Sequence, residues 1–200
     1  MAFEQRGRSG GSRKRTSGFS PSRSEDEGSK DTKPAREKKP PTPERLEQRA
    51  RNVLLHQLAR SAKSTQQLRK ILENREIPSE IAERVLERFT EVGLIDDQAY
   101  AETIVNSRRN FKGLSKSAIK RELNEKGVPS AFIETAIESI TAEDDFEAAK
   151  QLAVRRIRQM SSLTREVRER RLAGYLGRKG YPSSVVFAAI KFAESQIEPV

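Results

Sequence analysis

The sequence predicts an all-α fold made of three tandem three-helix repeats. Three segments align without gaps, and each ends with a turn, a proline and a serine: LRKILENREIPS, IKRELNEKGVPS and LAGYLGRKGYPS. Their prolines, Pro78, Pro129 and Pro182, lie 51 and then 53 residues apart. A repeated period of this length is typical of helical repeat proteins, in which each unit packs on its neighbours.

The segment that follows each proline predicts a buried helix. Apolar residues stand at positions i, i+1, i+4, i+5 and i+8, which is the spacing of one helix face. The three sets are Ile81, Ala82, Val85, Leu86 and Phe89; Phe132, Ile133, Ala136, Ile137 and Ile140; and Val185, Val186, Ala189, Ile190 and Ala193. We expect the repeats to span residues 44–96, 97–145 and 146–200.

Residues 1–43 differ in composition from the rest of the chain. Gly, Pro and Ser supply 17 of these 43 residues, and the segment has a net charge of +5. Such a sequence buries too little apolar surface to offset the entropy of ordering, so we expect a disordered basic tail. Its cluster Arg13-Lys14-Arg15 favours contact with nucleic-acid phosphates, while a solubilising tail without a partner is the alternative.

The first repeat departs from the other two at its turn. Glu76 stands where Gly127 and Gly180 stand in the later copies, so either this turn closes differently or Glu76 adopts a strained left-handed conformation.

A helix over 45–60 is expected to bury Leu54, Leu55 and Leu58. Ser64 with Gln67 predicts a capping box. The single histidine, His56, is interpreted as a surface residue.

The stretch from Gly93 to Pro129 predicts a helix, a basic loop, a second helix and a turn. Asp96 or Asp97 is expected to cap the first helix, and Ser115 the second, because their oxygens accept the unpaired N–H groups of a first turn. Every basic residue of this repeat lies between Arg108 and Lys126. We interpret this cluster as a binding surface, and a solvated helix face is the alternative.

The third repeat carries the strongest charge signal, a net charge of +6 with nine Arg or Lys between Arg155 and Lys179. Arginine suits bidentate contact with phosphate or carboxylate. Tyr175 and Tyr181 are interpreted as partly buried, with base stacking as the alternative. Gly174 and Gly177 are expected inside a helix, where they would permit close helix packing.

The sequence excludes several kinds of chemistry. One His and no Cys rule out zinc sites built on Cys/His clusters, Cys–His nucleophile pairs and disulfides, and no P-loop motif is present. The pairs Asp96-Asp97 and Asp144-Asp145 are interpreted as helix caps. We expect no enzyme, no cofactor, no metal and no membrane span. The absence of Cys fits a reducing compartment, here the cytoplasm.

The central stretch, GLIDDQAYA…SRR…KG…IKRELNEKGVP, together with RRLAGYLGRKGY in the last repeat, closely resembles the RecX family of bacterial regulators of the RecA recombinase. The resemblance covers about residues 45–195. It implies an elongated, curved, solenoid-like helical body that lies in the groove of the RecA–DNA filament. In DNA repair, recombination and the SOS response, such a protein would inhibit ATP hydrolysis and strand exchange.

The partners implied are the RecA filament and, weakly and with strong salt dependence, single- and double-stranded DNA, with this chain acting as a monomer. The candidate contacts, chosen from charge and repeat register, are Arg108, Arg109, Lys112, Lys116, Lys120, Arg155, Arg156, Arg158, Arg168, Arg171, Arg178 and Lys179. A stand-alone basic DNA-binding protein is the first alternative, because the net charge is +10. A helical scaffold for another protein is the second.

Overall fold

A computed structural model of the chain describes residues 42–197, and every regular element among them is a helix. The expected tail over 1–43 lies almost wholly outside the described residues. The first repeat comprises α1 (Pro43–Arg60), α2 (Thr65–Glu73) and α3 (Ser79–Glu91). In the second repeat, α4 (Asp97–Ser107) continues into a π-turn, η1 (Arg108–Lys112), and is followed by α5 (Lys116–Glu125) and α6 (Ser130–Ile137).

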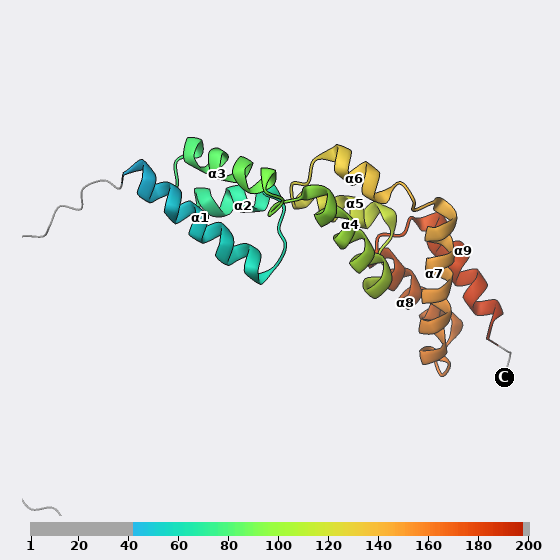
Figure 1. Cartoon of the computed structure of the whole chain (residues 1–200). Coiled ribbons are helices and arrows are strands. Elements are labelled where there is room, and N and C mark those ends of the chain that lie inside the picture. The colour runs from blue at the N-terminus through green and yellow to red at the C-terminus, as the bar shows by residue number, and fades with distance from the viewer. Residues whose placement is uncertain (1–41, 198–200) are drawn as a thin grey trace, which may run out of the picture. The chain divides into compact units, whose positions relative to one another are not determined.

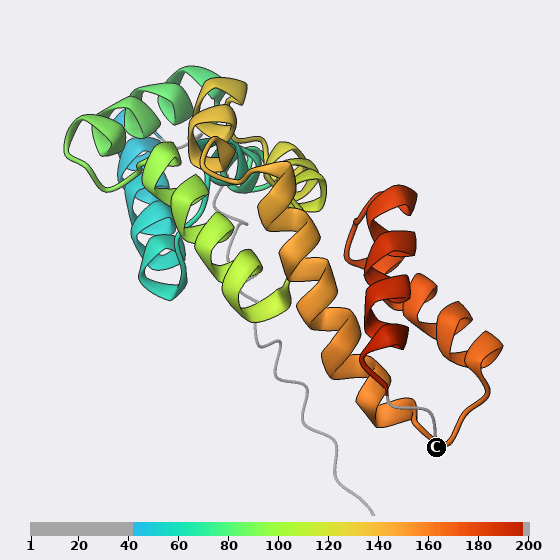
Figure 2. The ribbon, with the colours of Figure 1, turned by 90° about the vertical axis from the view of Figure 1, so that its right-hand side faces the viewer.

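The third repeat comprises α7 (Ala142–Ile157), a short 3₁₀ turn η2 (Arg158–Met160), α8 (Arg165–Arg178) and α9 (Ser183–Ser195). Its first helix thus begins a few residues ahead of the expected start at residue 146. Figure 1 shows the nine helices of the described residues in chain order, and Figure 2 shows α7 lying beside α8 and α9. The prediction of an all-α fold with three three-helix units is confirmed.

Each repeat has a hydrophobic core of its own. Three separate clusters form around α1–α3, α4–α6 and α7–α9, and the apolar stripe of the third helix in each repeat enters its cluster as expected. One expectation in α1 is wrong. Leu54 is fully buried, whereas Leu55 is 49% exposed because it stands one residue, about 100° of helix rotation, away from the face that Ala50 and Leu54 share.

A buried serine joins each repeat to the next. Ser64 caps α2 by accepting a hydrogen bond from the Gln67 N–H (3.2 Å), and Gln67 completes the predicted capping box. The same Ser64 hydroxyl donates to the carbonyl of Lys126 in the second repeat. Ser115 caps α5 in the same manner and donates to the carbonyl of Gly180 in the third repeat (2.7 Å).

A carboxylate from the following repeat completes each joint. Asp97 accepts the N–H of Thr65 at 2.8 Å, and Asp145 accepts the N–H of Lys116 at 3.0 Å, both at the first residue of the second helix. Their neighbours act within their own helices: Asp96 is the N-cap of α4, and Asp144 completes the capping box of Thr141, the N-cap of α7. The capping interpretation of the two Asp pairs is therefore confirmed. One member of each pair acts locally and the other acts across the repeat boundary.

The turn glycines are required by these joints. Gly127 (φ 71°) and Gly180 (φ 85°) have left-handed backbones, and a Cβ atom on either would lie 2.5 Å from a side-chain carbon of the preceding repeat, on Gln66 or Ala118. Glu76 has the same left-handed conformation (φ 58°) and closes an equivalent turn, but no repeat precedes it among residues 42–197. Of the two alternatives for Glu76, the strained backbone is therefore the one observed.

We predict that Gly180→Ala destabilises the chain by more than the ~1–2 kcal/mol that a left-handed backbone costs an L-residue, because the methyl group would also collide with Ser115 and Ala118. Gly93→Ala adds the same left-handed strain (φ 72°) where a Cβ atom would meet nothing within 4 Å, and it is the matched control, with an expected loss of ~1–2 kcal/mol. Urea unfolding followed by circular dichroism measures both. Equal losses in the two variants would contradict the proposed role of the joint.

Candidate functional site

The basic loop of the second repeat is a wide π-turn at the end of α4. It closes at Gly113 (φ 58°), where a Cβ atom would lie 2.9 Å from Leu152 of α7. Two arginines of this turn point toward the protein. Arg108 binds both carboxylate oxygens of Glu122 on α5 at 2.6–3.0 Å, and Arg109 forms an ion pair with Asp145, the residue that caps α5. Both guanidinium groups are thus engaged within the fold.

The lysines of this region differ in their environment. Lys116 donates its Nζ to the Ile140 carbonyl at 2.7 Å, and Lys120 forms an ion pair with Glu134 of α6. Lys112 is exposed, and its backbone carbonyl accepts a hydrogen bond from Lys179 of the third repeat. Of the five candidate contacts in this repeat, four already hold intramolecular partners, and Lys112 presents its side chain to solvent.

The Arg108–Glu122 pair stabilises the fold because each side chain already has a partner of opposite charge in the free protein. The hydrogen bond from Arg108 holds the pKa of Glu122 below its usual 4.5, with partial burial opposing the shift, and Glu122 raises the pKa of Arg108. Removing Glu122 would leave the largely buried Arg108 without its ion pair, which is the costly way to break such a pair. A phosphate would therefore have to compete with Glu122 for Arg108.

The arginines of the third repeat divide into a paired and an exposed set. Arg168 binds Glu194 of α9 through two nitrogens at 2.7–3.1 Å and also donates to the Leu163 carbonyl. This arginine therefore fastens α8 to α9. The side chains of the other candidate arginines are exposed, namely Arg155, Arg156, Arg158, Arg171 and Arg178.

Four arginines gather around one pocket on α7 and α8. The pocket has a volume of about 530 Å³, and its lining includes Arg156, Arg170, Arg171, Arg178 and Tyr175. We call it the arginine pocket. The guanidinium of Arg156 lies 5.7 Å from the centre of the Tyr175 ring, and the Lys179 ammonium lies 5.1 Å from it, so the half-buried ring holds two cations. No carboxylate lines the pocket among the described residues.

The predictions for Tyr181, which follows α8, and for the two glycines of α8 have different outcomes. Tyr181 is buried and donates to the Gly113 carbonyl at 3.2 Å, and burial raises its pKa to about 12, so the core interpretation is confirmed. The expectation that Gly174 and Gly177 permit close helix packing is wrong. A Cβ on Gly177 would meet no atom within 4 Å, and one on Gly174 would meet only the Arg178 guanidinium at 3.3 Å.

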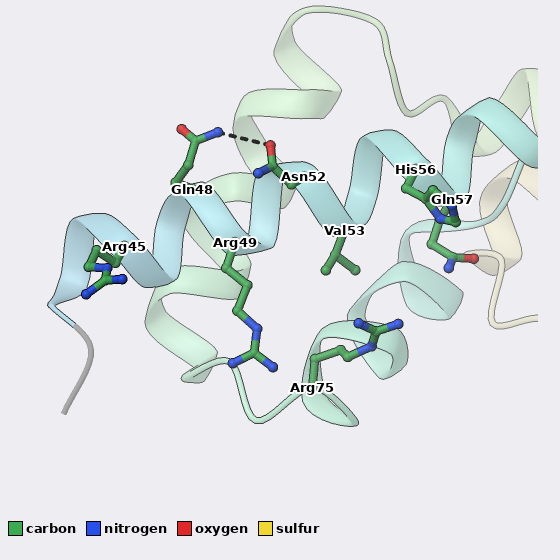
Figure 3. Close-up of a pocket in the computed structure, with 8 residues that line it drawn as sticks. All are labelled: Arg45, Gln48, Arg49, Asn52, Val53, His56, Gln57 and Arg75. Carbon is green, nitrogen blue, oxygen red and sulfur yellow. Dashed lines mark hydrogen bonds between the residues drawn. The ribbon is translucent and has the colours of Figure 1, made fainter. Parts of the chain in front are cut away.

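A second basic pocket lies on α1 and was missed by sequence reasoning. Its volume is about 590 Å³, and its lining includes Arg45, Arg49, Arg75 and His56 (Figure 3). Figure 3 shows Arg49 on α1 and Arg75, from the turn after α2, both directed into the space between these two elements. The signal in the sequence was Arg45 and Arg49 at i, i+4, but Arg75 joins them only through the fold. His56 is a surface residue, as interpreted.

The fold and these surfaces define a tandem three-helix repeat protein with basic pockets on its first and third repeats. None of the helices between residues 42 and 197 is long and apolar enough to cross a membrane. Family models for the first, second and third three-helix domains of RecX match residues 50–89, 96–137 and 143–190.

Relatives and solved structures agree with these matches. A regulatory protein RecX from Streptomyces coelicolor is 42% identical over 157 residues, covering 78% of this chain and 83% of the relative, and one from Thermobifida fusca is 38% identical over 149 residues, covering 74% and 80%. The crystal structure of RecX from Lactobacillus salivarius has the same fold, with a TM-score of 0.64 at 19% identity, covering 75% of this chain and 97% of that one. This chain belongs to the RecX family of regulatory proteins.

We predict that Glu122→Gln lowers the free energy of unfolding by about 1–3 kcal/mol at pH 7, because Arg108 loses its charged partner. The folded-state pKa of Glu122 is lowered, so its stabilisation is present above about pH 4.5 and is lost as the pH falls through that lowered value. Urea unfolding at pH 7 and pH 3 should therefore show the two proteins converging at pH 3. The exposed Glu138→Gln controls for a general charge effect, and a difference that persists unchanged at pH 3 would contradict the assignment.

Proposed function

We propose that this chain is a non-enzymatic regulator of the RecA recombinase that binds in the groove of the RecA–DNA filament and inhibits ATP hydrolysis and strand exchange. The observation that carries the proposal is the match of all three RecX domain models across residues 50–190. The physical features support it. Basic pockets lie on the first and third repeats and exposed cations on all three, and a filament offers both phosphates and acidic side chains to such surfaces.

The exposed candidates are proposed as the direct contacts: Lys112, Arg155, Arg156, Arg158, Arg171 and Arg178. Arg108, Arg109, Lys116, Lys120, Arg168 and Lys179 hold contacts within the fold, and we propose that they contribute positive potential while keeping those partners. Each exposed contact is weak by itself, so binding depends on their number and falls as salt rises. The chain acts in the cytoplasm as a monomer, in DNA repair, recombination and the SOS response.

A stand-alone DNA-binding protein is the second candidate function. The arginine pocket and the net charge of +10 favour it, because both would attract DNA without a recombinase. The two functions differ in where tight binding occurs. A filament regulator binds naked DNA weakly, whereas the second candidate binds it tightly.

The test is ATP hydrolysis by the matching RecA on single-stranded DNA, with this chain added at substoichiometric amounts. We expect inhibition by the full chain, and about tenfold more protein for half-inhibition after Lys112→Glu, Arg155→Glu and Arg158→Glu are combined, because reversed charges repel phosphate and acidic side chains. The control combines Arg51→Glu, Arg84→Glu and Arg88→Glu, which changes the net charge equally on the first repeat.

Equal inhibition by both triple variants would show that the proposed contacts are wrong. A full chain that leaves hydrolysis unchanged in an active filament would refute the regulator function and favour the DNA-binding protein. Comparing the full chain with one that begins at Glu44 reports whether residues 1–43 contribute.

A further inference from the structure

The arginine pocket occupies a face that the other repeats use for joining. Gln66 of the first repeat and Ser117 and Ala118 of the second contact the turn glycines of the next repeat. Counted back from the repeat prolines, Arg170 and Arg171 stand at the positions of Ser117 and Ala118. No further repeat follows them within the described residues, so this face is open and lined by cations instead of small side chains.

These cations are not neutralised within the described fold. Arg165 and Arg168 on the same helix form ion pairs with Glu169 and Glu194, but no described carboxylate forms one with Arg170, Arg171 or Arg178. Three like charges held around one pocket repel each other, and an anion seated among them removes that repulsion. Arginine also matches the geometry of phosphate oxygens.

The two glycines of α8 are not required by helix packing. A glycine inside a helix is less favourable than an alanine, yet neither Gly174 nor Gly177 has a packed neighbour that requires it. Their absent side chains leave the helix surface beside Arg178 open. Gly174 lines the pocket, and a ligand that approaches the helix closely there would explain a glycine at this position.

An exposed aromatic side chain stands in the π-turn of the second repeat. Phe111, in the π-turn, is 88% exposed. Its neighbour Lys112 accepts the hydrogen bond of Lys179, whose ammonium also lies over Tyr175 in the pocket lining. These two contacts connect the π-turn that carries Phe111 to the pocket lining across the boundary between the second and third repeats. Tyr175 already holds cations on its ring, so Phe111 is the aromatic side chain available for stacking.

We propose that the arginine pocket and Phe111 form a binding site for single-stranded nucleic acid, with phosphates held by Arg170, Arg171 and Arg178 and one base stacked on Phe111. Cations combined with an exposed aromatic ring are the usual elements of such sites. A duplex offers phosphates but keeps its bases stacked inside, so it gains nothing from Phe111. The proposal rests on the proposed function, in which the chain meets DNA in the filament, and it assigns that contact to named residues.

The test measures binding of fluorescent oligothymidylate by anisotropy at several salt concentrations, using the full chain without recombinase. Combining Arg170→Gln, Arg171→Gln and Arg178→Gln should raise Kd at least tenfold at low salt. It should also reduce the slope of log K against log salt by about 2, since each phosphate contact on a single strand contributes about 0.7. The control combines Arg51→Gln, Arg84→Gln and Arg88→Gln, and it should keep the original slope.

Two single variants separate this site from a general attraction to charge. Phe111→Ala should weaken binding to the oligonucleotide about fivefold or more and leave binding to a duplex of equal length unchanged. Gly174→Ala should raise the thermal unfolding midpoint while weakening oligonucleotide binding, because the new methyl group meets the Arg178 guanidinium. A purely structural role for Gly174 would not give this opposite pair of effects.

Equal losses in the pocket variant and its control would overturn the site. Unchanged single-strand binding by Phe111→Ala would overturn the single-strand assignment. The same conclusion would follow if ATP, added at an equal concentration of phosphate groups, displaced the oligonucleotide from the protein. RecA ATPase inhibition, measured on the same variants, keeps the two proposals distinguishable. A variant that inhibits RecA after losing oligonucleotide binding contradicts only the binding site. A chain that binds the oligonucleotide but does not act on RecA contradicts only the regulator function.

Discussion

The hydrogen bond from a buried serine to the turn of the next repeat is the constraint on which the arrangement of the repeats depends. Each repeat core is small, so the repeats need a specific contact between them. Ser64 and Ser115 are fully buried and satisfy two needs at once, since each accepts an N–H of its own helix and donates to a carbonyl of the following repeat. The hydroxyl can reach that carbonyl only because glycine lets the turn approach so closely.

The same joint explains how the described series of repeats ends. At the first repeat, Glu76 replaces the turn glycine, and its side chain would fill the space that a preceding repeat needs. At the third repeat, α8 begins about one turn earlier than α2 and α5 relative to the repeat proline. Arg168 stands where Ser64 and Ser115 stand, and it is bound to Glu194. Neither end is built to accept another repeat by this contact.

Sequence reasoning predicted the features that depend on neighbours along the chain. The repeats, the third-helix stripes and the caps by Ser64, Asp96 and Ser115 follow from spacing of a few residues and were found as expected. It could not predict partners brought together by folding. Arg109 and Asp145 lie 36 residues apart, and charge alone made Arg109 look like a surface residue. The glycines of α8 were misread because local sequence does not show whether a neighbouring helix is present.

Repeat position therefore decides which charges serve the fold and which remain for a ligand. In the first two repeats, a cation on the second helix pairs with a carboxylate on the third, as Arg69–Glu83 and Lys120–Glu134. The corresponding positions in the third repeat are Ala173 and Phe187, so this ion pair is missing there. The N-terminal part of α8 is also not covered by another described repeat, which removes the requirement for small side chains. The last repeat can thus carry unpaired arginines at little cost to folding, whereas the same residues in α2 or α5 would collide with the next turn.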